Sequence, residues 1–435
     1  MKQKTTKVKG DPVKSIELRL SNVNVSLENF SLSHIESQAI FLRQEIFEKI
    51  IRQIFASIEK LAVKTKRCKC GSIPVKNGKE KRVICTIGGK VTFVRSRMTC
   101  RACGANYYPL DEALDIASGA KHSIRATEAL LDLATDLPYA KTSSYAQKLS
   151  FIEASAQTIL DMARLEGAKL LLADEKERKA AFDTKAIFPA QAARKSLAIV
   201  QVDSTGINDR KSGSWMDTKV GIIYSRSACV SKKRNLILDK NVYATLDSLE
   251  KFKQNFYISC HKMGVFGAAT VIFVADGMPW IKRLQKEMFG QAIYLLDPWH
   301  LAKNISLAYG KENTEVADTL TQLAYYGEAA SLLENIKLDI ERCRDPDKKE
   351  KLRSLYVYIR SNRDGVENYK KVGILGSGVV EKTVDILVAR RFKLRGMSWY
   401  DKNAAKLLRL RLLKLNGEWD NYWEKRFNEK SITEF

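Results

Sequence analysis

The spacing of hydrophobic residues divides the first half of the chain into helical and strand-like stretches. After a weak strand, apolar residues recur every three or four positions between Ser33 and Leu61, which predicts an amphipathic helix. The segment VICTIGGKVTFVRSRMTC alternates apolar and polar positions and predicts a β-hairpin that turns at Gly88-Gly89. Helical spacing returns from about 112 to 180, so a second group of helices is expected there.

The pattern changes after residue 196. Three strand-like runs follow one another, SLAIVQVDSTGI, TKVGIIYSRSACV and NLILDKNVYATL. A helix over Leu246–Met263 comes next, then the apolar strand ATVIFVADG, a helix from about Trp280 and the strand AIYLLDPWH. Three strands, a helix and then alternating strands and helices are the order of an RNase H-like α/β unit.

Two further stretches are helical in pattern. Residues 301–372 are charged and contain no strand-like run, so we expect an all-α insertion, after which GILGSGVVEKTV predicts a helix beginning after Gly376 or Ser377. Earlier in the chain, SSYAQKLS and SAQTILDMARLEGAKLL flank the turn FIEASA. This spacing suits a DNA-binding helix-turn-helix, although many helical hairpins share it.

Composition narrows the class of protein. A chain of 435 residues is too long for one ordinary domain, and an apolar fraction of 45% is enough for real cores. Lysine and arginine total 74 against 50 acidic residues, and this net charge of +24 points to a polyanionic partner, first of all nucleic acid. The N-terminus lacks the apolar segment of a secretory signal, and no run of about 18 apolar residues predicts a membrane span. We therefore expect a cytoplasmic, nucleoid-associated protein with no membrane contact.

Three carboxylates stand out by their positions. Asp203 in VDST and Asp276 in VADG each follow an apolar strand-like run, and Glu381 lies early on the helix after the Gly-Ser-Gly turn. Phosphodiester chemistry by two metal ions needs carboxylates on rigid neighbouring elements, where they bridge ions about 3.5–4 Å apart. Mg²⁺, or Mn²⁺ in its place, prefers such oxygen ligands. The three side chains are therefore candidate catalytic residues and metal ligands.

Each of these carboxylates also has a purely structural interpretation. An Asp at a strand end commonly caps a turn, Asp-Gly is a frequent turn dipeptide, and a single Glu on a helix is usually solvated. The combination of two strand-terminal aspartates, an α-insertion and a Glu on the closing helix of a basic chain favours the catalytic interpretation.

Two cysteine pairs flank the predicted hairpin. RCKCG supplies Cys68 and Cys70, and TCRACG supplies Cys100 and Cys103. Four thiolates in this arrangement suit tetrahedral Zn²⁺, and the glycine after each pair permits a tight turn around the sulfur. The first pair has only one intervening residue, and reduced free thiols are the alternative. Burial as small hydrophobic side chains is expected for the other four cysteines: Cys85, Cys229, Cys260 and Cys343.

Several segments share a combined pattern: VDST, VADGMPWI, LLDPWHLAKN, GSGVVEKTV, RRFKLRGMSW and LLRLRLL. Together they resemble the DDE transposases of bacterial and archaeal insertion sequences, with the ISKra-type and ISLre-type elements as the closest group. These groups are distant relatives of the Mutator-like and hAT transposases. The resemblance spans roughly Arg67 to Leu413 and implies that Asp203, Asp276 and Glu381 form the catalytic triad.

The resemblance also bears on Asp297 and His300. This Asp-x-x-His pair is similar to a signature that follows the second catalytic Asp in the same superfamilies and is accessory to the active site. His300 would then contact a substrate phosphate or orient a carboxylate. Alternatively, it only caps or packs the helix that begins at Trp299.

Basic residues are densest after Glu381. Arg390, Arg391 and Lys393 follow it closely and are candidates for holding DNA phosphates near the metal ions. A charged helix is usually only solvated, which is the alternative for about half of the basic residues that continue to Lys414.

The sequence therefore predicts an α/β protein with an RNase H-like catalytic core, an all-α insertion, and a zinc-ribbon-like hairpin and helical DNA-binding region before them. The expected regions are an N-terminal helical region at 1–66, the zinc-ribbon-like module at 67–111, the helical DNA-binding region at 112–190, the first part of the core at 196–300, the insertion at 301–372, and the closing helix with basic C-terminal helices at 373–435.

The predicted function is that of a DDE transposase which binds double-stranded DNA at the ends of its element as a homo-oligomer. It would hydrolyse the DNA strands there and join the freed 3′-hydroxyl to target DNA. Two alternatives remain. One is a transposase-derived DNA-binding protein that no longer cuts, and the other is an RNase H-like nuclease that hydrolyses without joining strands.

Overall fold

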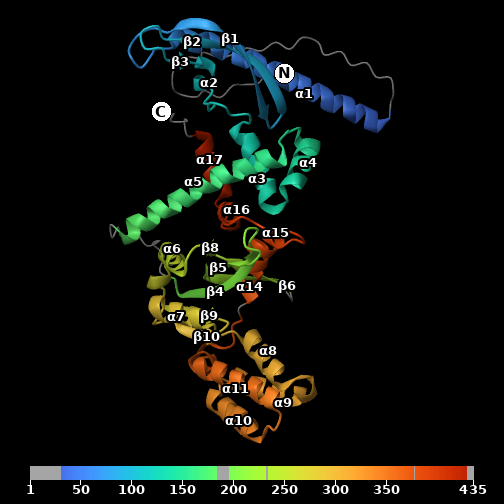
Figure 1. Cartoon of the computed structure of the whole chain (residues 1–435), viewed down its shortest axis with the longest axis vertical. Helices are drawn as coiled ribbons and strands as arrows, with labels where there is room; N and C mark the ends of the chain where they lie inside the picture. Colours follow the sequence, from blue (N-terminus) through green and yellow to red (C-terminus); the bar gives the residue numbers. More distant parts are fainter. Residues whose placement is uncertain (1–30, 184–194, 232–233, 377, 429–435) are drawn as a thin grey trace. The chain divides into compact units, whose positions relative to one another are not determined.

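The structure, a computed structural model, describes residues 31–183, 195–231, 234–376 and 378–428. The chain divides into two compact units, unit 1 with Met1–Met162 and Asp420–Phe435, and unit 2 with Ala163–Trp419. Both units combine helices with β-sheet, so the protein is mixed α/β (Figure 1). Among the helices in the described ranges, none combines the length and the apolar character needed to cross a membrane.

Unit 1 begins with a long helix, α1 (Leu32–Thr65), which matches and extends the expected one; the weak strand expected before it lies outside the described residues. The small antiparallel sheet that follows has the order β1-β2-β3, with bounds Val75–Thr86, Gly89–Thr99 and Asn106–Tyr107. The hairpin turns at Ile87-Gly88, one residue earlier than expected, because Gly89 already pairs with Thr86.

One face of α1 covers this sheet. Phe47, Ile51 and Phe55 recur every four residues and pack against a buried cluster that includes Val91 and Phe93. The ring of Phe55 meets that of Phe93 edge-on at 4.9 Å. The amphipathic pattern of the helix is therefore explained by burial against β2.

Helices complete unit 1. Those of this part of the chain are α2 (Pro109–Ala113), α3 (Ile124–Asp136), α4 (Tyr139–Ser150), the beginning of α5 (Ala156–Phe182) and most of α17 (Trp419–Asn428). The helices α4 and α5 correspond to the two expected around FIEASA. Phe151, in the left-handed region at φ 57°, ends α4.

Unit 2 is built on a five-stranded mixed sheet of order β10-β9-β4-β5-β8. The strands β4, β5 and β8 pair antiparallel, whereas β9 and β10 run parallel to β4. The bounds are Leu197–Asn208 for β4, Trp215–Tyr224 for β5, Asn241–Thr245 for β8, Thr270–Ala275 for β9 and Ile293–Leu296 for β10.

The second and third strand-like runs each contain two strands instead of one. The additional strands, β6 (Arg226–Ser231) and β7 (Arg234–Leu238), pair with each other in a separate ribbon. The chain leaves the ribbon at Asp239, whose φ of 49° breaks the extended conformation and whose carboxylate pairs with Arg226 at 2.7 Å. The pattern of hydrophobic residues in the sequence did not predict this break between β7 and β8.

Helices cover both faces of the five-stranded sheet (Figure 1). Alternate residues of β4, such as Val200 and Val202, pack with the helices α6 (Leu249–Lys262) and α7 (Pro279–Met288). The residues between them face the other side, where α14 (Gly378–Val384) packs on β4 and β5. A short 3₁₀ turn, Val265–Gly267, lies between α6 and β9.

A group of helices follows β10. These are α8 (Pro298–Tyr309), a 3₁₀ turn (Lys311–Asn313), α9 (Thr314–Tyr325), α10 (Ala329–Arg342), α11 (Pro346–Ser361), α12 (Arg363–Glu367) and α13 (Tyr369–Val372). The helical stretch starts slightly before the expected residue 301 because Asp297 caps α8 directly after the strand. The chain then returns as α14, a π-helical turn (Asp385–Ala389), α15 (Arg390–Phe392) and α16 (Asp401–Leu415).

Candidate active site

The parallel strands β4 and β9 bring two of the predicted carboxylates to the same level. Leu197 pairs with Thr270, and this register holds as far as Gln201. Two residues further along, it places Asp203 level with Asp276, on strands that lie about 4.8 Å apart. Asp203 does not end its strand as expected, because β4 continues to pair with β5 beyond the point where β9 stops.

The turn that carries Asp276 is held by the helix α11. Tyr358 donates its hydroxyl hydrogen to the carbonyl oxygen of Asp276 at 2.7 Å. Gly277 has a φ of +89°, and a Cβ there would lie 2.7 Å from the amide nitrogen of Asn362. The carboxylate of Asp276 accepts the backbone N–H of Met278 at 2.9 Å. The turn-capping interpretation of Asp276 is therefore correct, and the residue still lies at the end of β9, level with Asp203 on β4.

Glu381 lies on α14, the helix that packs on β4 and β5. Nδ1 of His300 lies 3.7 Å from Glu381 Oε1 and 2.7 Å from Asp297 Oδ2. Asp297 is fully buried, and the same oxygen accepts the backbone N–H of His300 at 2.8 Å. Asp297 thus caps α8 and orients the imidazole of His300 at the same time, so the cap of this helix is Asp297 and not His300.

Metal-ligand spacing is met by one group of side chains at this edge, Asp297, His300 and Glu381, whose ligand atoms lie within 4.8 Å of one another. Asp297 is a poor candidate for direct ligation because its Oδ2 already accepts hydrogen bonds and the residue is inaccessible. We interpret Asp297 as the group that orients His300, and Glu381 as the accessible one of the two carboxylates.

The carboxylates influence each other electrostatically. Burial raises the pKa of Asp203 to about 6; the backbone N–H of Ser204 opposes this, and the negative charges of Asp276 and Glu381 reinforce it. Burial also raises the pKa of Asp276. The hydrogen bond with Asp297 raises the pKa of His300. An edge that gathers this much negative charge is well suited to a cation.

The three predicted basic residues lie in different surroundings. Arg390 is exposed and pairs with Asp385 at 2.9 Å. Lys393 donates to the hydroxyl of Thr205, two residues beyond Asp203. Burial lowers the pKa of Lys393, and the negative charge of Asp203 partly opposes this. Lys393 therefore lies beside the carboxylate edge.

Arg391 requires a correction. Only 1% of its surface is exposed, and its guanidinium lies over the ring of Trp399 at 5.0 Å, so it is not available to a DNA phosphate. The π-helical turn at Asp385–Ala389 inserts an extra residue per turn, which rotates the following positions away from those of a regular α-helix. This rotation turns Arg391 inward.

Two features of the site were not found from the sequence. Tyr358 and Asn362 support the Asp276 turn, but nothing in their spacing distinguishes them from other polar helix residues. Gln201, which accepts a hydrogen bond from the backbone of α14, could have been found, because a glutamine inside the apolar run LAIVQV is a signal for a buried polar contact.

The four cysteines of the predicted zinc site do come together in unit 1. Their Sγ atoms all lie within 4.8 Å of one another, and four cysteines so placed could bind a metal such as zinc. Gly71 and Gly104 follow the two pairs with φ values of 87° and 75°, as the tight turns require. A hydrogen bond with the Tyr107 hydroxyl lowers the pKa of Cys68 to about 6, which favours the thiolate form.

The remaining cysteines divide into two groups. Cys85 and Cys260 are buried as expected, whereas Cys229 is exposed and Cys343 is half-buried. The expectation was wrong for the latter two because Cys229 lies on the β6–β7 ribbon and Cys343 directly follows α10.

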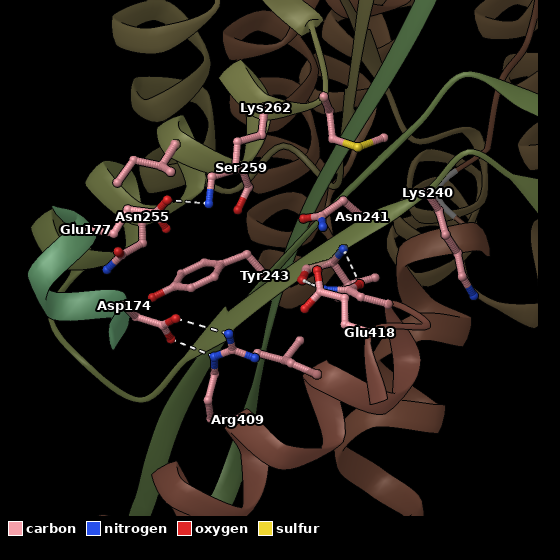
Figure 2. Close-up of a pocket in the computed structure, with 15 residues that line it drawn as sticks. Asp174, Glu177, Lys240, Asn241, Tyr243, Asn255, Ser259, Lys262, Arg409 and Glu418 are labelled. Carbon is pink, nitrogen blue, oxygen red and sulfur yellow. Dashed lines mark hydrogen bonds and ion pairs between the residues drawn. The ribbon is translucent and has the colours of Figure 1, made fainter. Parts of the chain in front are cut away.

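A polar cavity of about 310 Å³ lies at the β8 edge of the sheet, away from the carboxylates (Figure 2). Asp174 and Arg409 form an ion pair there at 2.6 Å, and Glu177 pairs with Lys262 at 2.5 Å. Since these charges pair with one another, the cavity is consistent with a structural role.

Comparison with known proteins gives one family. The model described as "Uncharacterised protein family (UPF0236)" matches residues 26–430. The UPF0236 protein TTE2489 of Caldanaerobacter subterraneus subsp. tengcongensis is 20% identical over 384 residues, which cover 86% of this chain and 77% of that protein. A second relative from the same organism has the same identity over 86% of this chain and 76% of its own length, under a name that joins eleven designations from TTE0033 to TTE2212.

Proposed function

The chain belongs to the UPF0236 family, and we propose that it is a DDE transposase, an enzyme that cuts DNA at the ends of its element and joins the freed 3′-hydroxyl to target DNA. The observation that carries this proposal is that Asp203 lies level with Asp276 and interacts electrostatically with it and with Glu381. Glu381 in turn lies at metal-ligand spacing from His300 and Asp297. Asp203, Asp276 and Glu381 come from the strand β4, the turn after β9 and the helix α14, which are far apart in the sequence. Carboxylates gathered on rigid elements are what two-metal phosphodiester chemistry needs.

The strand order of unit 2 supports the proposal. Three consecutive antiparallel strands, β4, β5 and β8, occupy one side of the sheet, and the parallel strands β9 and β10 follow on the other. This is the order of an RNase H-like core, and a helical insertion before the closing α14 is the arrangement that the resemblance to DDE transposases implies. Fold alone does not determine function, so the carboxylates remain the main support.

The donor set fits Mg²⁺ or Mn²⁺. Carboxylate oxygens are hard ligands, and the negative charges of Asp276 and Glu381 near Asp203 are charges that a divalent cation would neutralise. Such ions, when bound, would activate the attacking oxygen and stabilise the leaving one. Asp203, Asp276 and Glu381 would hold them.

The neighbouring side chains have complementary roles in the proposal. His300, oriented by Asp297, would donate a hydrogen bond to a substrate phosphate or hold Glu381 in place. Lys393 beside Thr205 would balance phosphate charge next to Asp203. Arg390 is an exposed cation on the helical segment that follows Glu381.

Two observations favour DNA transposition over other phosphoryl-transfer reactions. The net charge of +24 suits a polyanionic substrate. In addition, the names of three of the five relatives join several designations, eleven in one case. One protein with many designations in one organism is what a mobile element copied within a genome would produce.

The cysteine cluster of unit 1 is proposed to be a structural Zn²⁺ site in a zinc-ribbon-like module. Two short turns that each end in a left-handed glycine, joined by the β1–β2 hairpin, support this assignment. We assign DNA recognition to this module and to the helices α4 and α5, acting in a homo-oligomer assembled on DNA.

The proposal is tested by isosteric variants. Asp203→Asn, Asp276→Asn and Glu381→Gln should each abolish Mg²⁺-dependent cleavage of duplexes that carry the DNA flanking the reading frame, and should leave DNA binding intact. Gel-based cleavage and binding assays on the full chain measure both. Asp318→Asn, an exposed carboxylate on α9, is the matched control and should cut normally.

The outcomes separate the alternatives. Near wild-type cleavage by any of the three variants would remove that residue from the site. A wild-type protein that binds DNA but does not cut it would support the transposase-derived binding protein. Cleavage without joined products in a strand-transfer assay would support the nuclease.

A further inference from the structure

Gln201 is a fully buried polar residue on β4 whose side-chain amide joins three separate segments. Its Nε2 donates to the hydroxyl of Tyr224 at 3.1 Å and to the carbonyl of Gly376 at 3.1 Å. Its Oε1 accepts the backbone N–H of Val380 at 2.9 Å. Gly376 and Val380 lie 175 and 179 positions away in the sequence, so these bonds exist only in the folded chain.

The bond to Val380 satisfies a helix terminus. Val380 lies in the first turn of α14, where backbone N–H groups have no acceptor within the helix. Such groups are usually satisfied by a neighbouring cap residue. Here the acceptor comes from a strand of the sheet, so the start of α14 is attached to β4.

Each of the two residues that form this attachment, Gln201 and Val380, lies close in sequence to a candidate carboxylate. Gln201 precedes Asp203 by two residues and therefore shares its face of β4. Val380 directly precedes Glu381. Gly376 lies beside another acidic residue, Asp297, since a Cβ at this glycine would be 3.8 Å from Asp297 Oδ1. One side chain thus connects the backbone segments that carry or flank three acidic groups.

We propose that Gln201 is a positioning residue that holds Glu381 at a fixed distance from Asp203 for joint metal binding. This inference rests on the proposed function, because the distance matters only if the two carboxylates share ions. A side chain of similar size without an amide would leave the buried N–H of Val380 without its partner. The helix α14 would then shift or loosen, and the two carboxylates would lose their preorganised spacing.

The decisive variant is Gln201→Met, which keeps the length of the side chain and removes its hydrogen bonds. Its matched control is Gln285→Met on α7. Gln285 is also buried, at 5% exposure, and its Nε2 donates to the carbonyl of Phe289, away from the carboxylates. Both variants lose a buried amide, so a general loss of stability should affect both.

Two measurements on the full chain test the inference. Hydrogen–deuterium exchange without metal or DNA should rise in the peptide over 378–392 for Gln201→Met and stay unchanged there for Gln285→Met. Calorimetric titration with Mn²⁺ alone should show about tenfold weaker binding at the Asp203-dependent site for Gln201→Met, the size expected when a residue supporting metal ligands is removed. Gln285→Met should bind Mn²⁺ with wild-type affinity.

The results that would overturn the inference are distinct. Unchanged exchange in 378–392 of Gln201→Met would show that the amide does not hold α14. Faster exchange with wild-type Mn²⁺ affinity would show that it holds the helix without positioning Glu381. Asp203→Asn marks the failure of the proposed function itself, which would be evident if wild-type and Asp203→Asn proteins bound Mn²⁺ equally.

Discussion

At the scale of a single residue, the negative charge of Asp203 lowers the free energy of unfolding, because the side chain is partly buried in the candidate site. Its side chain is half-buried on β4, and burial raises its pKa from 3.8 to about 6. The folded chain therefore favours the protonated carboxyl, whose stabilising contribution is complete below the ordinary pKa. That contribution disappears as the pH rises through about 6.

Removing this charge should stabilise the protein at neutral pH. In the absence of divalent metal, Asp203→Asn should raise the free energy of unfolding by on the order of 2 kcal/mol, and the gain should shrink toward zero near pH about 4. Urea unfolding at the two pH values measures the difference. The exposed Asp318→Asn should change little at either pH, and a destabilised Asp203→Asn at neutral pH would contradict this expectation.

At the scale of elements, the β1–β2 hairpin and its two cysteine turns form a small module with its own chemistry. Cys100 is fully buried and Cys68 nearly so, while Cys70 and Cys103 are exposed. Sulfur atoms this close, such as those of Cys68 and Cys70 at 3.2 Å, are favourable when a cation holds the thiolates together. The module's apolar core is small, so a structural metal would contribute directly to its stability.

The purified chain is therefore expected to contain about one Zn²⁺ per molecule. Cys100→Ser should lose the metal and unfold the hairpin at lower temperature, whereas the exposed Cys229→Ser on the β6–β7 ribbon should change neither property. Elemental analysis and thermal unfolding measure these effects. Absence of zinc together with rapid alkylation of all four thiols in the native wild-type protein would refute the site.

At the scale of the whole molecule, the net charge of +24 governs long-range attraction to nucleic acid. Only some of the basic residues can contact phosphates, because others, such as Arg391, are buried. Arg390 is exposed on the helical segment after Glu381, and Lys393 lies against Thr205 beside Asp203. These two are the candidates for phosphate contacts near the site.

Neutralising Arg390 and Lys393 to Gln together should weaken binding to duplex DNA of any sequence. The slope of log affinity against log salt should flatten by about 0.9 for each phosphate that is no longer neutralised. Lys337→Gln with Lys351→Gln removes the same charge from exposed positions on α10 and α11 and should flatten it less. Equal slopes for both double variants would indicate that Arg390 and Lys393 contribute only general charge.

Local patterns in the sequence determined much of the architecture. Apolar spacing predicted α1, the β1–β2 hairpin, the strands β4 and β9 and the helical stretch after β10, because each element buries one face against its neighbours. The same patterns identified the three carboxylates and the four cysteines as candidates. The cysteine pairs flank a hairpin, so their proximity follows once that hairpin is correct, whereas Asp203 and Asp276 become level only through the pairing of β4 with β9.

The tertiary structure alone decided the contacts between distant segments. The pairing of β6 with β7, the inward rotation of Arg391 by the π-helical turn and the amide of Gln201 between β4 and α14 have no counterpart in local spacing. Each depends on which groups remain unsatisfied after the elements pack. Hydrogen bonds across some 179 positions form only because burial makes an unpaired N–H or C=O unfavourable, and local sequence does not specify the partner.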